Sequence, residues 1–344
     1  MWRYSLIGHY SKRTPLAYTP YINTMGEKGL NLARQVSLNQ NPDVLFFGYT
    51  KDFKNQLKAI KDAKAKNPQV KIIVLSEEPL WDTVWSQDFF KKNNSAQIFD
   101  EEIDYFSFNH ANSKIYNFEK IPYFITTNDN FSATYRFLFK RNANLEKLDV
   151  IKLWDKHKYK LAFFFEKRLD PKYSVYFEDF QIHGLCNYRT ELASNLPNDS
   201  KLLVGKGWQK GTVRQDLPDW HLDKITALDQ KTLFLSALEN THQANYITEK
   251  MFDAYAINAI PLYIASPNHR ANEVFGKEAF INLYKLSIEE AQDKIMNFSY
   301  SEEFIDSYLS AQINLAQLFS QECTIRYERE RLCTTLNSEI LEIL

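Results

Sequence analysis

The chain has 344 residues, which is long for one compact core and sufficient for two domains. Its formal charge of −1 argues against a nucleic-acid-binding protein, because neutralising phosphates requires a clear excess of basic residues. Hydrophobic residues make up 44% of the chain, but no uninterrupted run approaches the ~20 apolar residues of a membrane span. We therefore expect a soluble protein.

The first half of the chain predicts alternating strands and helices. Val44–Tyr49 and Lys71–Leu75 are compact apolar runs, and the charged segment between them, Asp52–Lys66, has apolar residues at helical spacing. A strand, a helix and a strand within about thirty residues are typical of the βαβ unit of a parallel sheet. Ala96–Phe99 predicts a short third strand.

The same alternation returns after a junction near Leu145–Lys158. The predicted strands are Tyr159–Phe165, Lys201–Val204, Leu233–Leu238 and Ile260–Ala265. The predicted helices are Tyr173–Phe180, Asn187–Asn195, Thr248–Ala256 and the chain from Ser287 onward. Two such blocks predict two doubly wound, Rossmann-like α/β domains at residues 1–150 and 151–320, with a helical tail at 321–344. Ligands of these domains bind at the carboxyl ends of the strands, so we expect a site in the cleft between them.

The segment 238–267, LENTHQANYITEKMFDAYAINAIPLYIASP, carries the most informative pattern. It predicts a strand end, a loop, and a helix that is capped by Thr248 and carries Glu249 and Lys250 in its first turn. A lysine is unfavourable at a helix N-terminus unless an anion binds there, and Glu249 could accept hydrogen bonds from ribose hydroxyls. An ordinary Glu–Lys pair on a surface helix would explain the same two residues.

This segment resembles the donor-binding motif of glycosyltransferase family 10, the α-1,3/4-fucosyltransferases, and especially their bacterial members. The matching residues are Glu239-Asn240, Tyr246-Ile247-Thr248-Glu249-Lys250, Asp253-Ala254-Tyr255, Ile260-Pro261-Leu262-Tyr263 and Ser266-Pro267. Upstream, Gly205-Lys206-Gly207 and Val213-Arg214 resemble the family's glycine-rich strand end and the arginine that follows it. The resemblance covers the C-terminal half well and the N-terminal half faintly.

The resemblance implies the GT-B arrangement of two Rossmann-like domains, with the acceptor bound by the first and GDP-fucose by the second. Arg214 and Lys250 should then neutralise the GDP diphosphate, with Asn240 assisting. Glu249 should bind the ribose, and Tyr246 should line the fucose or phosphate pocket. The implied reaction is inverting transfer of L-fucose, in α-1,3 linkage, to a glycan that contains GlcNAc or Glc, such as a lipopolysaccharide O-antigen or core.

An inverting transferase also needs a general base, usually a carboxylate, and two candidates remain open. Glu77 follows the strand Lys71–Leu75 and resembles the glutamate of a Glu-Ser-Pro motif in animal members. Glu101, in Phe99-Asp100-Glu101, resembles the Phe-Asp-Glu of bacterial members and is slightly preferred. Both are expected at strand ends of the N-terminal domain, across the cleft from the donor. A solvated loop carboxylate would explain either residue equally well.

No metal ion or other cofactor is expected, because neither the cysteines nor the histidines show metal-ligand spacing. Three cysteines without a disulfide pattern predict a cytoplasmic protein, either free or peripheral at the inner membrane. Arg189 is a second candidate for the phosphates, although it also suits a surface helix. The expected partners are GDP-fucose and an oligosaccharide acceptor. The alternatives are a transferase for another sugar nucleotide and an inactive sugar-nucleotide- or glycan-binding protein.

Overall fold

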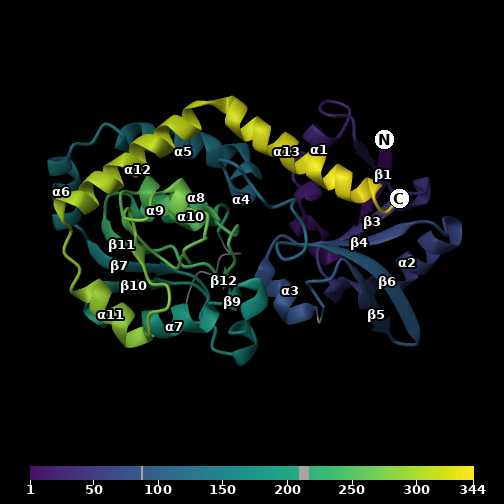
Figure 1. Cartoon of the computed structure of the whole chain (residues 1–344), viewed down its shortest axis with the longest axis horizontal. Helices are drawn as coiled ribbons and strands as arrows, with labels where there is room; N and C mark the ends of the chain where they lie inside the picture. The colour runs from purple at the N-terminus through teal and green to yellow at the C-terminus, as the bar shows by residue number, and fades with distance from the viewer. Residues whose placement is uncertain (87, 209–216) are drawn as a thin grey trace. The chain divides into compact units, whose positions relative to one another are not determined.

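The computed structural model describes residues 1–86, 88–208 and 217–344, and the chain divides into two compact units. Unit 1 comprises Met1–Asp129 together with Cys323–Leu344, and unit 2 comprises Asn130–Glu322. The chain therefore leaves unit 1 once and returns to it at the end (Figure 1). No helix among the described residues combines the length and apolar character that crossing a membrane requires.

Unit 1 is built on a six-stranded sheet with the order β2-β1-β3-β4-β6-β5. Its strands are β1 (Trp2–Leu6), β2 (Ala33–Gln35), β3 (Val44–Phe47), β4 (Lys71–Leu75), β5 (Asn93–Ile98) and β6 (Glu101–Phe108). Its helices are α1 (Thr19–Met25), α2 (Phe53–Lys66), α3 (Pro79–Trp85), α4 (Tyr123–Thr126) and α13 (Glu322–Leu341). Neighbouring strands pair in parallel except β5, which runs antiparallel to β6. Short 3-10 turns connect several of these elements.

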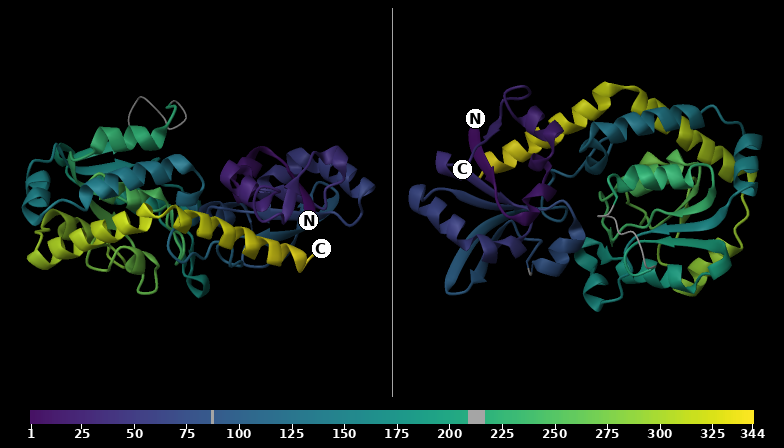
Figure 2. Two further views of the ribbon diagram at one scale, coloured as in Figure 1. Left: turned by 90° about the horizontal axis from the view of Figure 1, so that it is seen from above. Right: turned by 180° about the vertical axis from the view of Figure 1, so that it is seen from behind.

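Unit 2 is built on a five-stranded parallel sheet with the order β10-β7-β11-β13-β14. Its strands are β7 (Tyr159–Phe164), β10 (Lys201–Val204), β11 (Thr232–Ser236), β13 (Ile260–Tyr263) and β14 (Ile281–Asn282). Its helices are α5 (Asp129–Asn142), α6 (Lys147–Asp155), α7 (Cys186–Asn195), α8 (Trp220–Leu228), α9 (Glu249–Ala256), α10 (Ala271–Val274), α11 (Ile288–Met296) and α12 (Glu302–Ser320). Helices lie on both faces of this sheet (Figure 2). A small antiparallel sheet joins β8 (Tyr176–Phe177), β9 (Ile182–Gly184) and β12 (Thr241–His242).

The prediction of two Rossmann-like α/β units is confirmed, and most apolar runs form the strands expected of them. The expected helix over Tyr173–Phe180 is wrong, because this segment contains the short strand β8 and a 3-10 turn. Ala96–Phe99 does contribute to a strand, β5, but that strand is antiparallel to its neighbour. The cleft expected between the units stays a prediction.

The predicted domain boundaries differ from those of the structure. The first boundary lies between residues 129 and 130 rather than at 150, and residues 323–344 belong to unit 1 rather than forming a separate tail. The reason is that α13 buries Leu332, Leu336 and Ile340 in the core beside β1 and β3. Its Glu328 is also buried and accepts hydrogen bonds from three consecutive backbone N–H groups at residues 119–121. The C-terminal helix is therefore part of the hydrophobic core of unit 1 and not a separate tail.

Candidate functional site

In unit 2, the loop between β11 and α9 folds around a buried carboxylate. Glu239, which is 2% exposed, accepts hydrogen bonds from the backbone N–H and the hydroxyl of Thr248, each at 2.8 Å. The ammonium of Lys250 lies 2.8 Å from the other oxygen of Glu239 and 2.6 Å from the hydroxyl of Thr248. Sequence reasoning gave Glu239 no role, yet it fixes both the cap residue of α9 and the predicted phosphate-binding lysine.

Lys250 carries its charge in a shielded position. Burial lowers its pKa, but Glu239 and Glu249 raise it by more, so the pKa lies above its ordinary value and the ammonium is retained. Thr248 is the N-cap of α9, as predicted, but its hydroxyl donates to Glu239 and makes no capping hydrogen bond. The first N–H groups of α9 therefore receive no side-chain cap from Thr248, and they point along the positive end of the helix dipole.

Arg189 on α7 is a buried cation, 4% exposed, and not the surface residue that was the alternative. Its guanidinium donates to the carbonyl oxygen of Leu238 at 3.3 Å and lies 4.6 Å from the ring centre of Phe165. Among the ion pairs of the described residues, none involves Arg189, and its charge lowers the pKa of Lys250. A buried cation without a carboxylate partner is costly, so an anion at this position would stabilise both residues.

The other predicted donor residues that the structure describes belong to the same loop and to the start of α9. Glu249 is half-buried in the first turn of α9, 3.6 Å from the ammonium of Lys250. Asn240 accepts a hydrogen bond at its backbone oxygen from the N–H of Leu185, at 2.8 Å. Tyr246 is buried, and its role in lining the fucose or phosphate pocket stays a prediction. Arg214 lies outside the described residues, and its role stays a prediction.

Helix α9 carries a second buried carboxylate, Asp253, which is fully enclosed. It contacts His221 and Lys224, both on α8, and accepts a hydrogen bond of 2.7 Å from the hydroxyl of Tyr135 on α5. Burial raises the pKa of Asp253, but His221 and Lys224 lower it by more, so the carboxyl is held charged. Asp253 thus ties α9 to two neighbouring helices one turn beyond Lys250.

In unit 1, Glu77 lies two residues beyond the carboxyl end of β4 and is 1% exposed. One of its oxygens accepts from the Nε of Arg13 at 3.1 Å, and Arg13 also contacts Glu78. The other oxygen accepts from the hydroxyls of Tyr123, at 2.8 Å, and Tyr18, at 3.3 Å. Both oxygens of this carboxyl are therefore held by donors from three different segments.

The electrostatics of Glu77 suit a group that exchanges protons near neutrality. Burial raises its pKa, which Arg13 counteracts and Glu78 reinforces, and the result is about 7 against an ordinary value of 4.5. His110, whose ring lies 3.2 Å from the backbone oxygen of Glu77, has its pKa lowered by burial to about 3 and is neutral. A carboxyl with a pKa near the working pH matches the requirement for general base catalysis.

The expected placement of Glu101 at the carboxyl end of a parallel strand is wrong. Glu101 begins β6, and Phe108 at the end of β6 pairs with Leu75 at the end of β4. Glu101 and Phe108 are seven positions apart along β6, which corresponds to roughly 23 Å. Glu101 is instead a half-buried residue paired with Lys61 at 2.6 Å, at the amino end of β6, whereas Glu77 lies beyond the carboxyl end of β4. Its catalytic role stays a prediction, but Glu101 does not lie at the carboxyl end of a parallel strand, which was the reason for proposing it.

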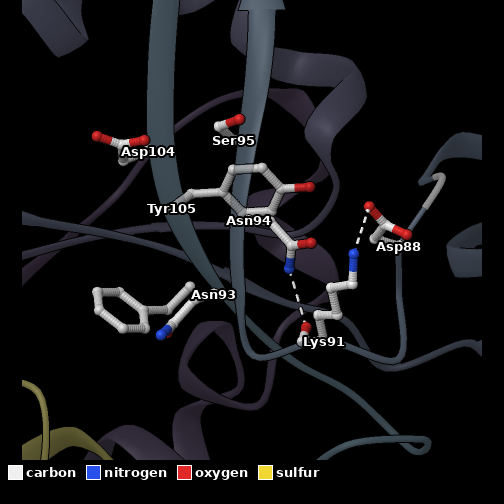
Figure 3. A pocket seen from close by; sticks show the side chains of 8 residues that line it. Asp88, Lys91, Asn93, Asn94, Ser95, Asp104 and Tyr105 are labelled. Carbon is white, nitrogen blue, oxygen red and sulfur yellow. Dashed lines mark hydrogen bonds and ion pairs between the residues drawn. The ribbon is translucent and has the colours of Figure 1, made fainter.

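Two surface cavities lie elsewhere. One of about 450 Å³ is bordered by the hairpin β5–β6 and by an ion pair of 3.1 Å between Lys91 and Asp88 (Figure 3). The other, of about 520 Å³, lies between α5 and α8. Neither is lined by a predicted catalytic or donor-binding residue.

Residues 184–340, which contain Arg189, the Glu239–Lys250 loop and α9, match the family described as glycosyltransferase family 10 (fucosyltransferase) C-term. The matched segment makes up less than half of the chain. No curated protein matches the chain. Solved structures titled "alpha1,3-Fucosyltransferase with GDP-fucose" and "alpha1,3-Fucosyltransferase" are similar at 16% identity and a TM-score of 0.46, and the match covers 90% of this chain and 81% of theirs. At these scores the likeness decides nothing about donor or mechanism.

Two residues of the candidate site in unit 2 could not be assigned a role from the sequence. Glu239 was visible in the motif, but nothing indicated that it would hold Lys250. Asp253 was also visible, but its partners on α8 and α5 are distant in sequence. In unit 1, nothing in the sequence linked Arg13 to Glu77. The signal that could have found the first two is the presence of carboxylates in otherwise apolar stretches, since buried carboxylates require partners.

Proposed function

We propose that the protein transfers L-fucose from GDP-fucose to a hydroxyl of a glycan that contains GlcNAc or Glc, with inversion at the anomeric carbon. The observation that carries the proposal is a pair of cations beside the start of α9, the half-buried Lys250 and the buried Arg189, within the segment that matches family 10. A diphosphate would supply the anion that Arg189 lacks among the described residues.

The donor chemistry follows from this charge arrangement. When the bond between the anomeric carbon and the phosphate oxygen breaks, its electron pair leaves with GDP, and negative charge develops on the diphosphate. Lys250, Arg189 and the first N–H groups of α9 would stabilise that charge. Glu249 is proposed to accept hydrogen bonds from the ribose hydroxyls. These cations can act without a metal ion, so metal-independent transfer is part of the proposal.

The acceptor chemistry requires a base, for which we propose Glu77. The acceptor oxygen attacks the anomeric carbon on the face opposite the departing GDP, and its proton passes to the carboxylate. The carboxyl of Glu77 is held by Arg13, Tyr18 and Tyr123, which fix its orientation. Its pKa of about 7 allows it to accept a proton and to release it to solvent after each turnover.

The deciding experiment measures GDP or UDP release by the purified protein from GDP-fucose, other GDP-sugars and UDP-sugars, with an array of GlcNAc- and Glc-containing glycans as acceptors. We expect GDP-fucose to be consumed in preference and an array glycan to be fucosylated. Preferred release from another nucleotide sugar would favour a transferase of different donor specificity. Nucleotide binding without turnover would favour an inactive binding protein. The α-1,3 linkage, a role in lipopolysaccharide synthesis and a cytoplasmic or membrane-peripheral location remain proposals of the same kind.

A further inference from the structure

The segment between β7 and α7 forms a small projecting hairpin, which we call the flap (residues 166–184). It lies almost wholly before residue 184, where the family match begins. Its strands β8 and β9 pair with each other, and β9 pairs with β12 from the donor loop. Gly184 is required at the base of the flap, because a Cβ there would lie 2.5 Å from the backbone oxygen of Tyr173.

Three rings form a ladder across the strands of the flap and its neighbour. Tyr176 lies opposite His183, and His183 lies opposite His242, in adjacent strand pairs. The ring centres of Tyr176 and His183 are 4.2 Å apart, and those of His183 and His242 are 5.2 Å apart. Because cross-strand partners project from the same face of a sheet, the three rings lie in one row on that face.

The inner end of the ladder is buried and neutral. His242 donates from Nδ1 to the backbone oxygen of Gln181, at 3.2 Å, and accepts at Nε2 from the N–H of Ser266, at 3.3 Å. Burial lowers its pKa to about 4, so the ring is uncharged at neutral pH. The outer end is open, since Tyr176 is 60% exposed. The ladder therefore anchors an exposed aromatic ring on a rigid, neutral base.

A carboxylate lies beside the outer part of the ladder. Glu178 is exposed and follows Tyr176 by two residues. It is close enough to His183 to raise the pKa of that ring, although burial lowers the pKa by more. An exposed ring next to a carboxylate offers a stacking surface and an acceptor of two hydrogen bonds, which are the contacts that a guanine base can satisfy.

The ladder is attached directly to the donor loop. His242 is two residues beyond Asn240, and the N–H of Leu185, the first residue after the flap, donates to the backbone oxygen of Asn240. Cys186, which follows, is 3.7 Å from the same oxygen and within reach of Arg189. A nucleotide with its diphosphate at Lys250 and Arg189 would thus have the flap as a neighbour.

We propose that the flap recognises the nucleobase of the donor, with Tyr176 stacking on the purine ring and Glu178 accepting hydrogen bonds from N1–H and the 2-amino group of guanine. This inference rests on the proposed function, because it requires a nucleotide donor at the Lys250 site. It assigns the choice of GDP over other nucleotides to a segment that the family match does not include.

The test compares GDP with inorganic diphosphate, which lacks the base, by calorimetry on the full chain. We expect Tyr176→Ala to weaken GDP binding about tenfold, the size of one lost stacking contact, and to leave diphosphate binding unchanged. Leu169→Ala is the matched control, since Leu169 is 51% exposed on the same flap and lies outside the ladder; it should bind both ligands like the wild type.

A second comparison isolates the carboxylate. Inosine diphosphate lacks only the 2-amino group, so the wild type should bind it about tenfold more weakly than GDP, and Glu178→Gln should reduce that preference. GDP affinity unchanged in both variants would overturn the inference, as would an equal loss for GDP and diphosphate in Tyr176→Ala. If the wild type binds diphosphate and GDP equally, base recognition fails while the phosphate site stands. Binding of neither ligand would overturn the proposed function and the inference with it.

Discussion

The main sheet of each unit places a buried glutamate just beyond the carboxyl end of a parallel strand, and the two residues differ in their partners. Glu77 in unit 1 is held by two tyrosine hydroxyls and by Arg13, which it shares with Glu78. Glu239 in unit 2 is held by Thr248 and Lys250. Burial raises the pKa of both carboxyls. The surroundings of Glu77 suit proton exchange, whereas Glu239 acts as a fixed anchor for a cation. The carboxyl ends of the strands in unit 1 are therefore suited to hold a base, and those in unit 2 to bind an anion.

The largest expected effect tests the base. Glu77→Gln should lower kcat by about 10²–10⁴-fold, because the amide cannot accept the acceptor proton, while GDP affinity stays the same. Steady-state kinetics and calorimetry check the two parts. Glu101→Gln is the matched control and should keep near-full activity. If instead Glu101→Gln is the inactive variant, the assignment of the base to the carboxyl ends of the strands in unit 1 is wrong.

The next effect tests the anion site. Lys250→Ala and Arg189→Ala should each weaken GDP binding by about 10²-fold, since the removal of either cation leaves phosphate charge uncompensated. Lys140→Ala, at an exposed lysine of the same unit, should leave the affinity unaltered. Titration calorimetry showing wild-type affinity in both site variants would exclude this site.

The pH dependence sharpens the comparison further. With a pKa of about 7, Glu77 is protonated below neutrality, so kcat/KM should fall about tenfold per pH unit below pH 7. The contribution of Glu77 to the free energy of unfolding has the opposite pH dependence. Because the folded-state pKa is above 4.5, the contribution of Glu77 is full below pH 4.5 and is lost as the pH rises through 7. The Tm of Glu77→Gln relative to that of the wild type should therefore increase between pH 5 and pH 8. A constant difference would contradict the raised pKa.

A smaller effect concerns the helix that carries Lys250. Asp253→Asn removes the charge that ties α9 to α8, and we expect GDP affinity to fall about tenfold with little change in kcat at saturating donor. Calorimetry and the separation of KM from kcat check this. Asp223→Asn, an exposed carboxylate on α8, serves as the control. Equal losses in kcat and GDP affinity would indicate general disruption rather than positioning.

The smallest expected effect is none at all. If Lys250 and Arg189 carry the charge stabilisation, EDTA should leave the transfer rate unchanged. Loss of activity that magnesium or manganese restores would show that these cations are insufficient, and would weaken the contrast between the strand ends of the two units.

The sequence predicted the parts of the fold that depend on local pattern. Compact apolar runs identified the central strands of both sheets, and the first turn of α9 begins at Glu249 as expected. Strand direction was not predictable in this way. The first three residues of the run Ala96–Phe99 form the end of β5. Phe99 adopts a left-handed conformation with φ of 55°, and the chain turns there into an antiparallel hairpin. That turn places Glu101 at the amino end of β6.

The candidate site was predicted in its residue types and not in its contacts. Lys250 and Glu249 followed from the motif, whereas the bond from Lys250 to Glu239 and the burial of Arg189 depend on how α7 packs. The flap was missed because its aromatic residues suggest helical spacing, while their ring contacts reach across strands to His242. Pairing between distant segments is set by tertiary packing, which a local pattern does not encode.

The position of α13 in the core of unit 1 has a consequence for synthesis. The ribosome must translate residues 130–322 before it reaches the helix that carries Leu332, Leu336 and Ile340, which takes roughly 10–40 s at ordinary elongation rates. During that interval the apolar face next to β1 and β3 has no cover, and the nascent chain resembles an exposed folding intermediate. Unit 2, whose residues are contiguous, can fold first. We therefore expect the unit that begins the chain to be the last to reach its native state.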